Sequence, residues 1–159
     1  LRQGVFSSLA ARIPGAVFLD LFAGSGGYGL EALSRGAQTG AFVERNARTA
    51  ACIRHNLGLV GRSLGRDLTS LPVVEADAAG VPWPGPGTPD LVFVDPPYAE
   101  IPALAPRLME RLATLLAPHP DALVVFEMPG ELEPETPGWR CVKRLGRGAR
   151  QPSARFYAR

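Results

Sequence analysis

The sequence predicts an α/β fold, a doubly wound and mostly parallel sheet of seven strands that ends in an antiparallel C-terminal strand pair. Three observations support this prediction. Short apolar runs alternate with amphipathic runs, as in sheets whose strands are buried on both faces. The apolar run Val17–Leu21 leads into a glycine-rich turn, residues 24–29, and a helical pattern follows at once. Acidic residues recur where strands are expected to end, which is the edge at which such sheets bind ligands.

The first half of the chain contains the first three expected strands. Apolar residues near the N-terminus recur at helical spacing and stop before Pro14, so a short helix is expected there. Gly36 ends the helix that follows the glycine-rich turn, and Asn46 starts the next one. In chain order we expect a helix within residues 1–11, a strand at 17–21, a helix at 27–35, a strand at 39–43, a helix from Asn46, a loop at 61–70 and a strand at 71–75.

The second half begins with an irregular surface segment, residues 81–89, which is rich in proline and glycine. Pro106 fits best in the first turn of a helix, so a helix is expected from there to Leu116. A glycine- and arginine-rich turn separates the last two apolar segments, which favours an antiparallel pair. The expected strands are residues 90–94, 122–126, 139–145 and 153–158.

Length and composition set limits on the protein. The 159 residues suit one domain, spanning 1–159. No apolar run reaches membrane-spanning length, so no membrane partner is expected. Cys52 and Cys141 show neither ligand spacing nor a disulfide framework, which favours a cytoplasmic setting and no metal. The net charge is only +2, and the chain opens on Leu1 rather than Met, so we expect it to be a trimmed piece of a longer protein.

Two ligands compete for the glycine-rich turn. Residues 24–29 fit G-x-G-x-x-G, and Glu44 lies about twenty residues further on, where a dinucleotide site has its ribose-binding acid. Asp20, just before the turn, argues for a different ligand, because a fixed carboxylate repels a pyrophosphate. It suits a molecule with an ammonium and a sulfonium group, which is S-adenosylmethionine.

The segment Asp95-Pro96-Pro97-Tyr98 decides between the two ligands. Two prolines after a buried strand remove two backbone donors and fix φ twice, so they hold an acid rigidly at the strand end. The Asp95 carboxylate and the Pro96 carbonyl can each accept an N–H bond from an exocyclic amine, while Tyr98 stacks on the base. An NAD-dependent oxidoreductase would leave this segment unexplained.

These motifs resemble those of a known enzyme class. Residues 20–26 look like the first motif of class I methyltransferases, and residues 95–98 look like the motif of methyltransferases that act on amino groups. The wider pattern resembles the bacterial small-subunit ribosomal RNA guanine-N2 methyltransferase family. The resemblance rests on residues 5–9, 20–26, 29–37, 42–44, 56–57 and 93–98.

The resemblance implies roles for individual residues. The catalytic residues would be Asp95, Pro96 and Tyr98. S-adenosyl-L-methionine would be held by Asp20, Phe22, Gly24, Ser25, Gly26, Glu44, Asp77 and Ala78. RNA would be held by Pro97. Separately from the resemblance, the arginines around the C-terminal turn predict a mobile basic edge of Arg144, Arg147, Arg150 and Arg155, in which Arg147 and Arg150 contact RNA phosphates; an ordinary solvated hairpin tip is the alternative. The implied partner is ribosomal RNA or the assembling small ribosomal subunit. We expect the protein to be a monomer.

Two alternatives remain open at this point. A DNA adenine-N6 methyltransferase uses the same Asp-Pro-Pro-Tyr motif, although the chain has no room for a separate domain that recognises a DNA target. A non-catalytic RNA-binding module with the same fold is the other alternative, and the intact Asp95 and Tyr98 weigh against it. The family usually carries a basic N-terminal segment with an Arg-Pro-Thr pattern, which this chain lacks.

Overall fold

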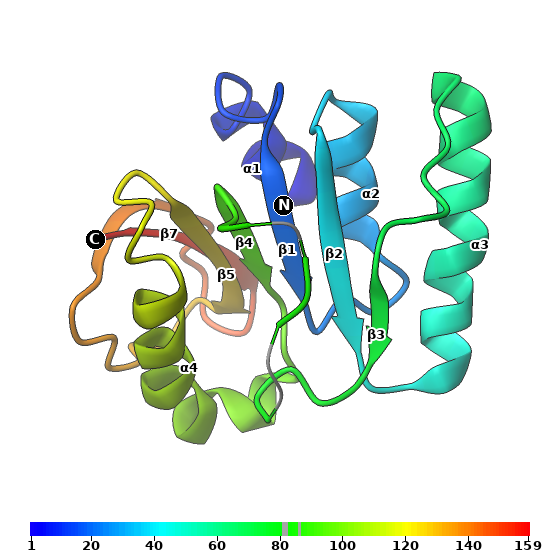
Figure 1. The fold of residues 1–159 in the computed structure, drawn as a ribbon. Coiled ribbons are helices and arrows are strands. Elements are labelled where there is room, and N and C mark those ends of the chain that lie inside the picture. Colours follow the sequence, from blue (N-terminus) through cyan, green and yellow to red (C-terminus); the bar gives the residue numbers. More distant parts are fainter. Residues whose placement is uncertain (81–82, 86) are drawn as a thin grey trace.

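The computed structural model describes residues 1–80, 83–85 and 87–159, which form a seven-stranded sheet with helices on both faces (Figure 1). The strands are β1 (Val17–Leu21), β2 (Thr39–Glu44), β3 (Val73–Glu75), β4 (Leu91–Val94), β5 (Leu123–Pro129), β6 (Arg140–Leu145) and β7 (Pro152–Ala158). The helices are α1 (Arg2–Ser8), α2 (Gly27–Ser34), α3 (Ala47–Leu64), the short 3-10 helix η1 (Tyr98–Glu100) and α4 (Ile101–Leu115).

The strand order β3-β2-β1-β4-β5-β7-β6 confirms the predicted fold class. Neighbours from β3 to β5 pair in parallel, whereas β7 runs antiparallel between β5 and β6. The chain leaves β1 toward β2 on one side and returns to β4 on the other. Ligand sites of such sheets lie at this switch point, outside the carboxyl ends of the strands.

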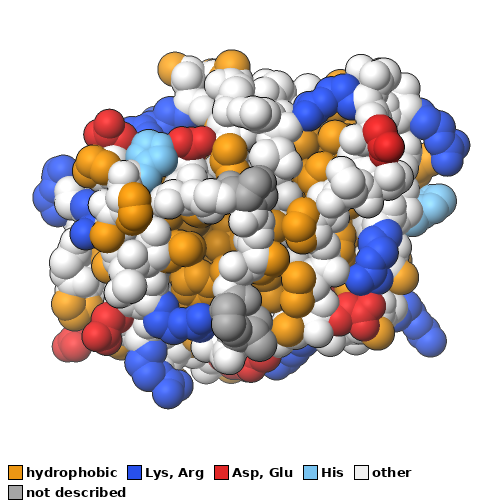
Figure 2. Space-filling model, viewed as in Figure 1, with side chains coloured by type: hydrophobic (Ala, Val, Ile, Leu, Met, Phe, Trp, Pro, Cys, Tyr) orange, Lys and Arg blue, Asp and Glu red, His pale blue; other side chains and the backbone are white. Residues whose placement is uncertain are grey.

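The two faces of the sheet hold separate cores because successive side chains of a strand point to opposite faces. Phe18 packs with Phe42 and Phe93 beneath α1, α2 and α3, while Leu19 and Val92 pack beneath α4. Figure 1 accordingly shows α4 in front of the sheet and α1 and α2 behind it. On the α4 face, hydrophobic side chains gather in the middle and charged side chains lie toward the periphery (Figure 2).

The prediction for the α4 region was wrong in one respect. The helix begins at Ile101, five residues before the expected start, and Pro106 lies inside it. Pro102 occupies the first turn instead, where a missing backbone N–H costs little. Both prolines fit the rule for a helix start, so the sequence did not distinguish them. The expected 81–89 segment includes residues 81, 82 and 86, which lie outside the described residues.

No helix among the described residues combines the length and the apolarity needed to cross a membrane.

At the amino edge of the sheet, His119 contacts Asp90 with its Nε2 atom 2.5 Å from Oδ1. The same Asp90 accepts the N–H of Val17, which starts β1. Sequence spacing gave His119 no partner, and this contact shows that it belongs to the framework at the edge opposite the strand ends that bind ligands.

Candidate active site

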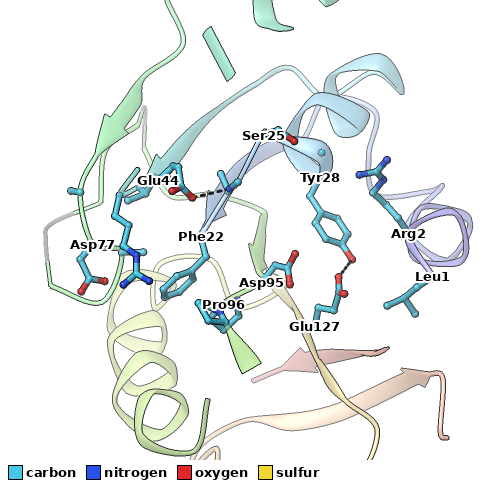
Figure 3. Close-up of a pocket in the computed structure, with 18 residues that line it drawn as sticks. Leu1, Arg2, Phe22, Ser25, Tyr28, Glu44, Asp77, Asp95, Pro96 and Glu127 are labelled. Atoms are coloured by element: carbon cyan, nitrogen blue, oxygen red, sulfur yellow. Dashed lines mark hydrogen bonds between the residues drawn. The ribbon is translucent and has the colours of Figure 1, made fainter. Parts of the chain in front are cut away.

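A cavity of about 660 Å³ opens at the carboxyl edge of the sheet. The chain segments that follow β1, β2, β3 and β4 line it, together with the end of β5 and the N-terminal residues Leu1 and Arg2 (Figure 3). It brings together nine residues that the sequence predicted for the site: Phe22, Gly24, Ser25, Glu44, Asp77, Ala78, Asp95, Pro96 and Pro97. Figure 3 shows Glu44 and Asp77 on one side of this cavity, with Asp95 and Glu127 on the other.

The glycine loop, residues 22–26, forms one wall of the cavity. Gly24 has φ +58°, and a Cβ added there would meet no atom within 4 Å, so the backbone is open to a ligand. Gly26 has φ +90° and caps α2, and a Cβ there would lie 3.1 Å from Leu30. Glycine thus serves two purposes in this loop, access at one position and a tight turn at the other.

Asp20 lies behind the glycine loop rather than in the cavity. Only 1% of its surface is exposed, and its Oδ2 atom accepts the N–H of Gly29 at 2.9 Å. Burial raises the pKa of Asp20 well above its usual value. Neither Asp20 nor Gly26 lines the cavity, in contrast to the direct ligand contact expected of them. Their observed contacts instead fix the loop and the start of α2.

Glu44 ties the end of β2 to the glycine loop. Its Oε1 atom accepts the N–H of Gly24 at 3.0 Å, and its Oε2 atom accepts the N–H of Asn46 at 2.8 Å. Each carboxylate oxygen has a second lone pair, so both can still accept a bond from a ligand. Asp77 is exposed after β3, and its Oδ1 atom accepts the N–H of Ala79. These two acids give one side of the cavity fixed hydrogen-bond acceptors.

Asp95 and Glu127 form an acidic pair on the other side. They follow Val94 and Phe126, which are register partners on the neighbouring parallel strands β4 and β5. Burial, followed by the charge of Glu127, raises the pKa of Asp95 to about 7. A carboxylate with such a pKa can both hold an amine and accept a proton near neutral pH.

Two tyrosines donate hydrogen bonds to Glu127. The Tyr28 hydroxyl donates to Oε2 at 2.7 Å, and the Tyr98 hydroxyl donates to Oε1 at 3.5 Å. Tyr28 is buried and stacks on Phe93 with 5.2 Å between the ring centroids. Tyr98 does not line the cavity in this structure, and 40% of its surface is exposed. Its ring therefore lies beside the acidic pair and is open to solvent.

Sequence reasoning missed Glu127 and Tyr28 as site residues. Glu127 directly follows the strand expected at residues 122–126, so it is an acid at a strand end like the acids that were predicted for the site. Tyr28 lies in the first turn of α2, and nothing in its local sequence indicates that its hydroxyl reaches Glu127. Arg2 also lines the cavity, and its position in α1 gave no indication of this.

The basic edge expected at the C-terminal turn, residues 146–151, is only partly present. Arg155 is 3% exposed and pairs with Glu133 at 3.3 Å. Arg144 pairs with the same glutamate at 3.2 Å and also donates to the Gly130 carbonyl. These two arginines stabilise the framework instead of presenting free charge, which corrects the expectation of a cluster of four. Arg147 and Arg150 remain exposed in the turn.

The C-terminal turn lies at the same edge of the sheet as the cavity. Pro152, the first residue of β7, pairs with Pro129, the last residue of β5.

In the part of the chain that the structure describes, no group of three or more His, Cys, Asp or Glu side chains is arranged to hold a metal ion.

Comparisons with known proteins agree with this architecture. The model of the family described as "Conserved hypothetical protein 95" matches residues 1–154. "Putative rRNA methyltransferase YlbH" of Bacillus subtilis (strain 168) is 31% identical over 152 residues, which cover 87% of this chain and 73% of the relative. "Ribosomal RNA small subunit methyltransferase D" of Escherichia coli (strain K12) is 35% identical over 98 residues, which cover 62% of this chain and 46% of the relative. A solved conserved hypothetical protein of Streptococcus pyogenes superposes with a TM-score of 0.76 at 29% identity, covering 99% of this chain and 94% of that one.

Proposed function

The chain belongs to the family described as Conserved hypothetical protein 95, and from this premise we propose that it methylates ribosomal RNA with S-adenosyl-L-methionine as donor. The relatives named above as rRNA methyltransferases support the reaction class. The observation that carries the proposal is that the glycine loop and Asp95 line the same cavity. A cofactor bound at the glycine loop would therefore lie beside the acid that would bind the amine. Residues 1–159 act as one domain in this proposal.

The charges of the cavity favour this cofactor over a dinucleotide. Among the described residues, four carboxylates and two guanidinium groups line it: Glu44, Asp77, Asp95, Glu127, Arg2 and Arg45. An excess of carboxylates attracts a ligand with ammonium and sulfonium groups and repels a pyrophosphate. The acceptors and the open backbone at Gly24 therefore fit S-adenosyl-L-methionine.

Residues on the Glu44 side of the cavity would hold the cofactor. The Gly24 and Ser25 backbone would contact its methionine part, Glu44 its ribose hydroxyls, and Asp77 with Ala78 its adenine, while Phe22 contributes an apolar wall. When bound, the cofactor supplies a methyl group activated by its sulfonium.

Residues after β4 would hold the acceptor amine. The Asp95 carboxylate and the Pro96 carbonyl accept its N–H bonds, and neither Pro96 nor Pro97 has an N–H that competes for those acceptors. The Tyr98 ring stacks on the base. Once the methyl group is transferred, the amine must lose a proton, and Asp95 with a pKa of about 7 is suited to accept it.

We further propose that the acceptor is guanine N2 in small-subunit rRNA, with Pro97, Arg147 and Arg150 contacting the RNA. The resemblance of the sequence motifs to the guanine-N2 family supports the base, and the similarity to the E. coli small-subunit enzyme supports the substrate. Mass-spectrometric mapping of methylated nucleosides in rRNA from a deletion strain tests both. A missing N2-methylguanosine is the expected result, and a missing N6-methyladenosine would contradict it.

A variant pair tests the site itself. Asp95→Ala should lower methyl transfer at least about 100-fold, because positioning provides much of the rate enhancement. Its affinity for S-adenosyl-L-homocysteine should stay within about twofold of the wild-type value, since Asp95 lies on the acceptor side of the cavity. Asp121→Ala is the matched control, because Asp121 is an exposed acid at the opposite edge of the sheet. Near-normal turnover of Asp95→Ala would exclude the assigned role.

A further inference from the structure

Glu127 lines the cavity beside Asp95, but no contact with the base has been assigned to it so far. Its Oε2 atom accepts the Tyr28 hydroxyl at 2.7 Å. Burial raises the pKa of Tyr28 above its ordinary value, so this hydroxyl stays protonated and acts as the donor. Tyr28 itself is packed between Phe6 and Phe93, with ring centroids at 6.1 Å and 5.2 Å. The aromatic core behind the site thus fixes the direction of the Glu127 carboxylate.

The other oxygen of Glu127 has spare capacity. Among the described residues, Oε1 accepts a hydrogen bond only from the Tyr98 hydroxyl, and 3.5 Å is at the long limit for such a bond. Because Tyr98 is exposed, its ring can move to stack on a base without disturbing the core. Oε1 can then accept a hydrogen bond from that base. Figure 3 shows that Glu127 faces the same part of the cavity as Asp95.

The acidic pair therefore offers two neighbouring acceptors to one base edge. Asp95 and Glu127 directly follow Val94 and Phe126, which are the last pair of residues in the parallel pairing between β4 and β5. Two carboxylates side by side suit two donors side by side. Guanine has such an edge, because N1–H and the N2 amine are adjacent donors, whereas adenine and cytosine place an acceptor nitrogen beside their amines.

We propose that Glu127 selects guanine by accepting the N1–H hydrogen bond while Asp95 holds the N2 amine. This inference rests on the proposed guanine-N2 activity and names the residue that reads the base. An ionised Glu127 opposite N1 of adenine or N3 of cytosine sets two acceptors against each other and leaves both unpaired, which is costly in a desolvated site. A carboxylate on N1–H also draws that proton away from the ring and so raises the electron density at N2.

The test exchanges both the residue and the base. Once the modified nucleotide is mapped, small-subunit RNA carrying guanine or 2-aminopurine at that position is made by splinted ligation and assembled into subunits. 2-Aminopurine keeps the N2 amine but has no N1–H. We expect the wild-type protein to prefer guanine at least about 100-fold in kcat/KM, because a site built for an N–H rejects the analogue that lacks it.

Glu127→Gln should reduce that preference at least about tenfold, because an amide can turn either its oxygen or its NH₂ group toward the base. Glu127→Asp keeps an acceptor and should keep the preference even if its rate falls. Glu135→Gln makes the same charge change at an exposed acid that does not line the cavity, and should behave as wild type. Binding of S-adenosyl-L-homocysteine to each variant checks that the fold is intact.

The outcomes separate the inference from the function it rests on. If Glu127→Gln lowers kcat/KM equally for guanine and 2-aminopurine, the ratio of the two values is unchanged and Glu127 has a structural role. That result would overturn the inference and leave the guanine-N2 activity standing. If Glu127→Gln does not fold, Glu127→Ala takes its place, and an unchanged preference for guanine in that variant overturns the proposal. Wild-type methylation of adenine or cytosine in place of guanine would overturn both.

Discussion

The carboxylate of Glu44, at the end of β2, accepts the N–H of Gly24 at 3.0 Å and so joins two strand ends that lie twenty residues apart in the chain. The same carboxylate lines the cavity beside the exposed backbone of Gly24. One side chain therefore both shapes the cofactor loop and faces its ligand.

Glu44→Ala should weaken binding of S-adenosyl-L-homocysteine about 10- to 100-fold, because hydrogen bonds to a charged acceptor are worth about 1.5–3 kcal/mol. Titration calorimetry measures the change. Glu75→Ala is the matched control, since Glu75 is the register partner of Glu44 on β3 but is exposed and pairs with Arg54. Equal effects of the two substitutions would argue against a ligand contact at Glu44.

Methyl transfer should rise with pH through about 7, because Asp95 holds the amine and accepts its proton only when ionised. The pH profile of kcat/KM measures this. Glu127→Gln removes the neighbouring charge, so its profile should have a midpoint at lower pH, and Glu135→Gln should leave the midpoint unchanged. A midpoint that does not respond to Glu127 would contradict the coupling within the acidic pair.

The stability of the protein should also depend on Asp95. The folded state keeps a proton on Asp95 that the unfolded chain releases above about pH 4, so the free energy of unfolding falls as the pH rises from there through about 7. Asp95→Asn removes this loss. We expect the variant to be more stable than wild type by up to about 4 kcal/mol at pH 8, since the pKa differs by about 3 units between the two states, and nearly equal to it at pH 4. Urea unfolding at the two pH values measures the difference, and a gain independent of pH would contradict the assignment.

Gly29→Ala should destabilise the fold by at least about 1–3 kcal/mol, as overpacking does. A Cβ there would lie 2.4 Å from the Phe42 ring and 2.6 Å from the Phe18 ring. Gly58→Ala is the control, because a Cβ at this position in α3 meets nothing within 4 Å and should stabilise the helix by up to about 1 kcal/mol. Thermal unfolding separates the two, and a neutral Gly29→Ala would show that the aromatic pair can move apart.

Replacing Arg147 and Arg150 with Ala should weaken RNA binding and flatten its salt dependence by roughly one to two units of slope. Both residues are exposed in the C-terminal turn, at the edge of the sheet that carries the cavity. Arg140→Ala with Lys143→Ala removes the same charge from β6 and serves as the control. An unchanged slope in the first double variant would place the RNA surface elsewhere.

The sequence predicted the sheet and the succession of helices and strands along the chain, because apolar runs and the glycines between them are local signals. Val17–Leu21 and Leu91–Val94 needed no partner to be recognised as buried strands. Local signals failed where two residues satisfied the same rule, as with Pro102 and Pro106 at the start of α4.

The site was predicted in part for the same reason. Glu44 and Asp95 lie in motifs, so their positions were visible in the chain. Glu127 and Tyr28 meet only through a contact 99 residues apart in sequence, which no local pattern contains. Asp20 lies in a motif as well, but whether its carboxylate faces the cavity or the N–H of Gly29 depends on the tertiary packing of α2.

The antiparallel insertion of β7 leaves β6 at one open edge of the sheet and the three-residue β3 at the other. Open edges invite strands of other molecules to add to a sheet, and proteins resist this with short strands, bulges and charged side chains. The β6 edge has a register shift between Cys141 and Lys143, and it carries Arg140 and Arg144. Neither edge is therefore a good template for the addition of another strand.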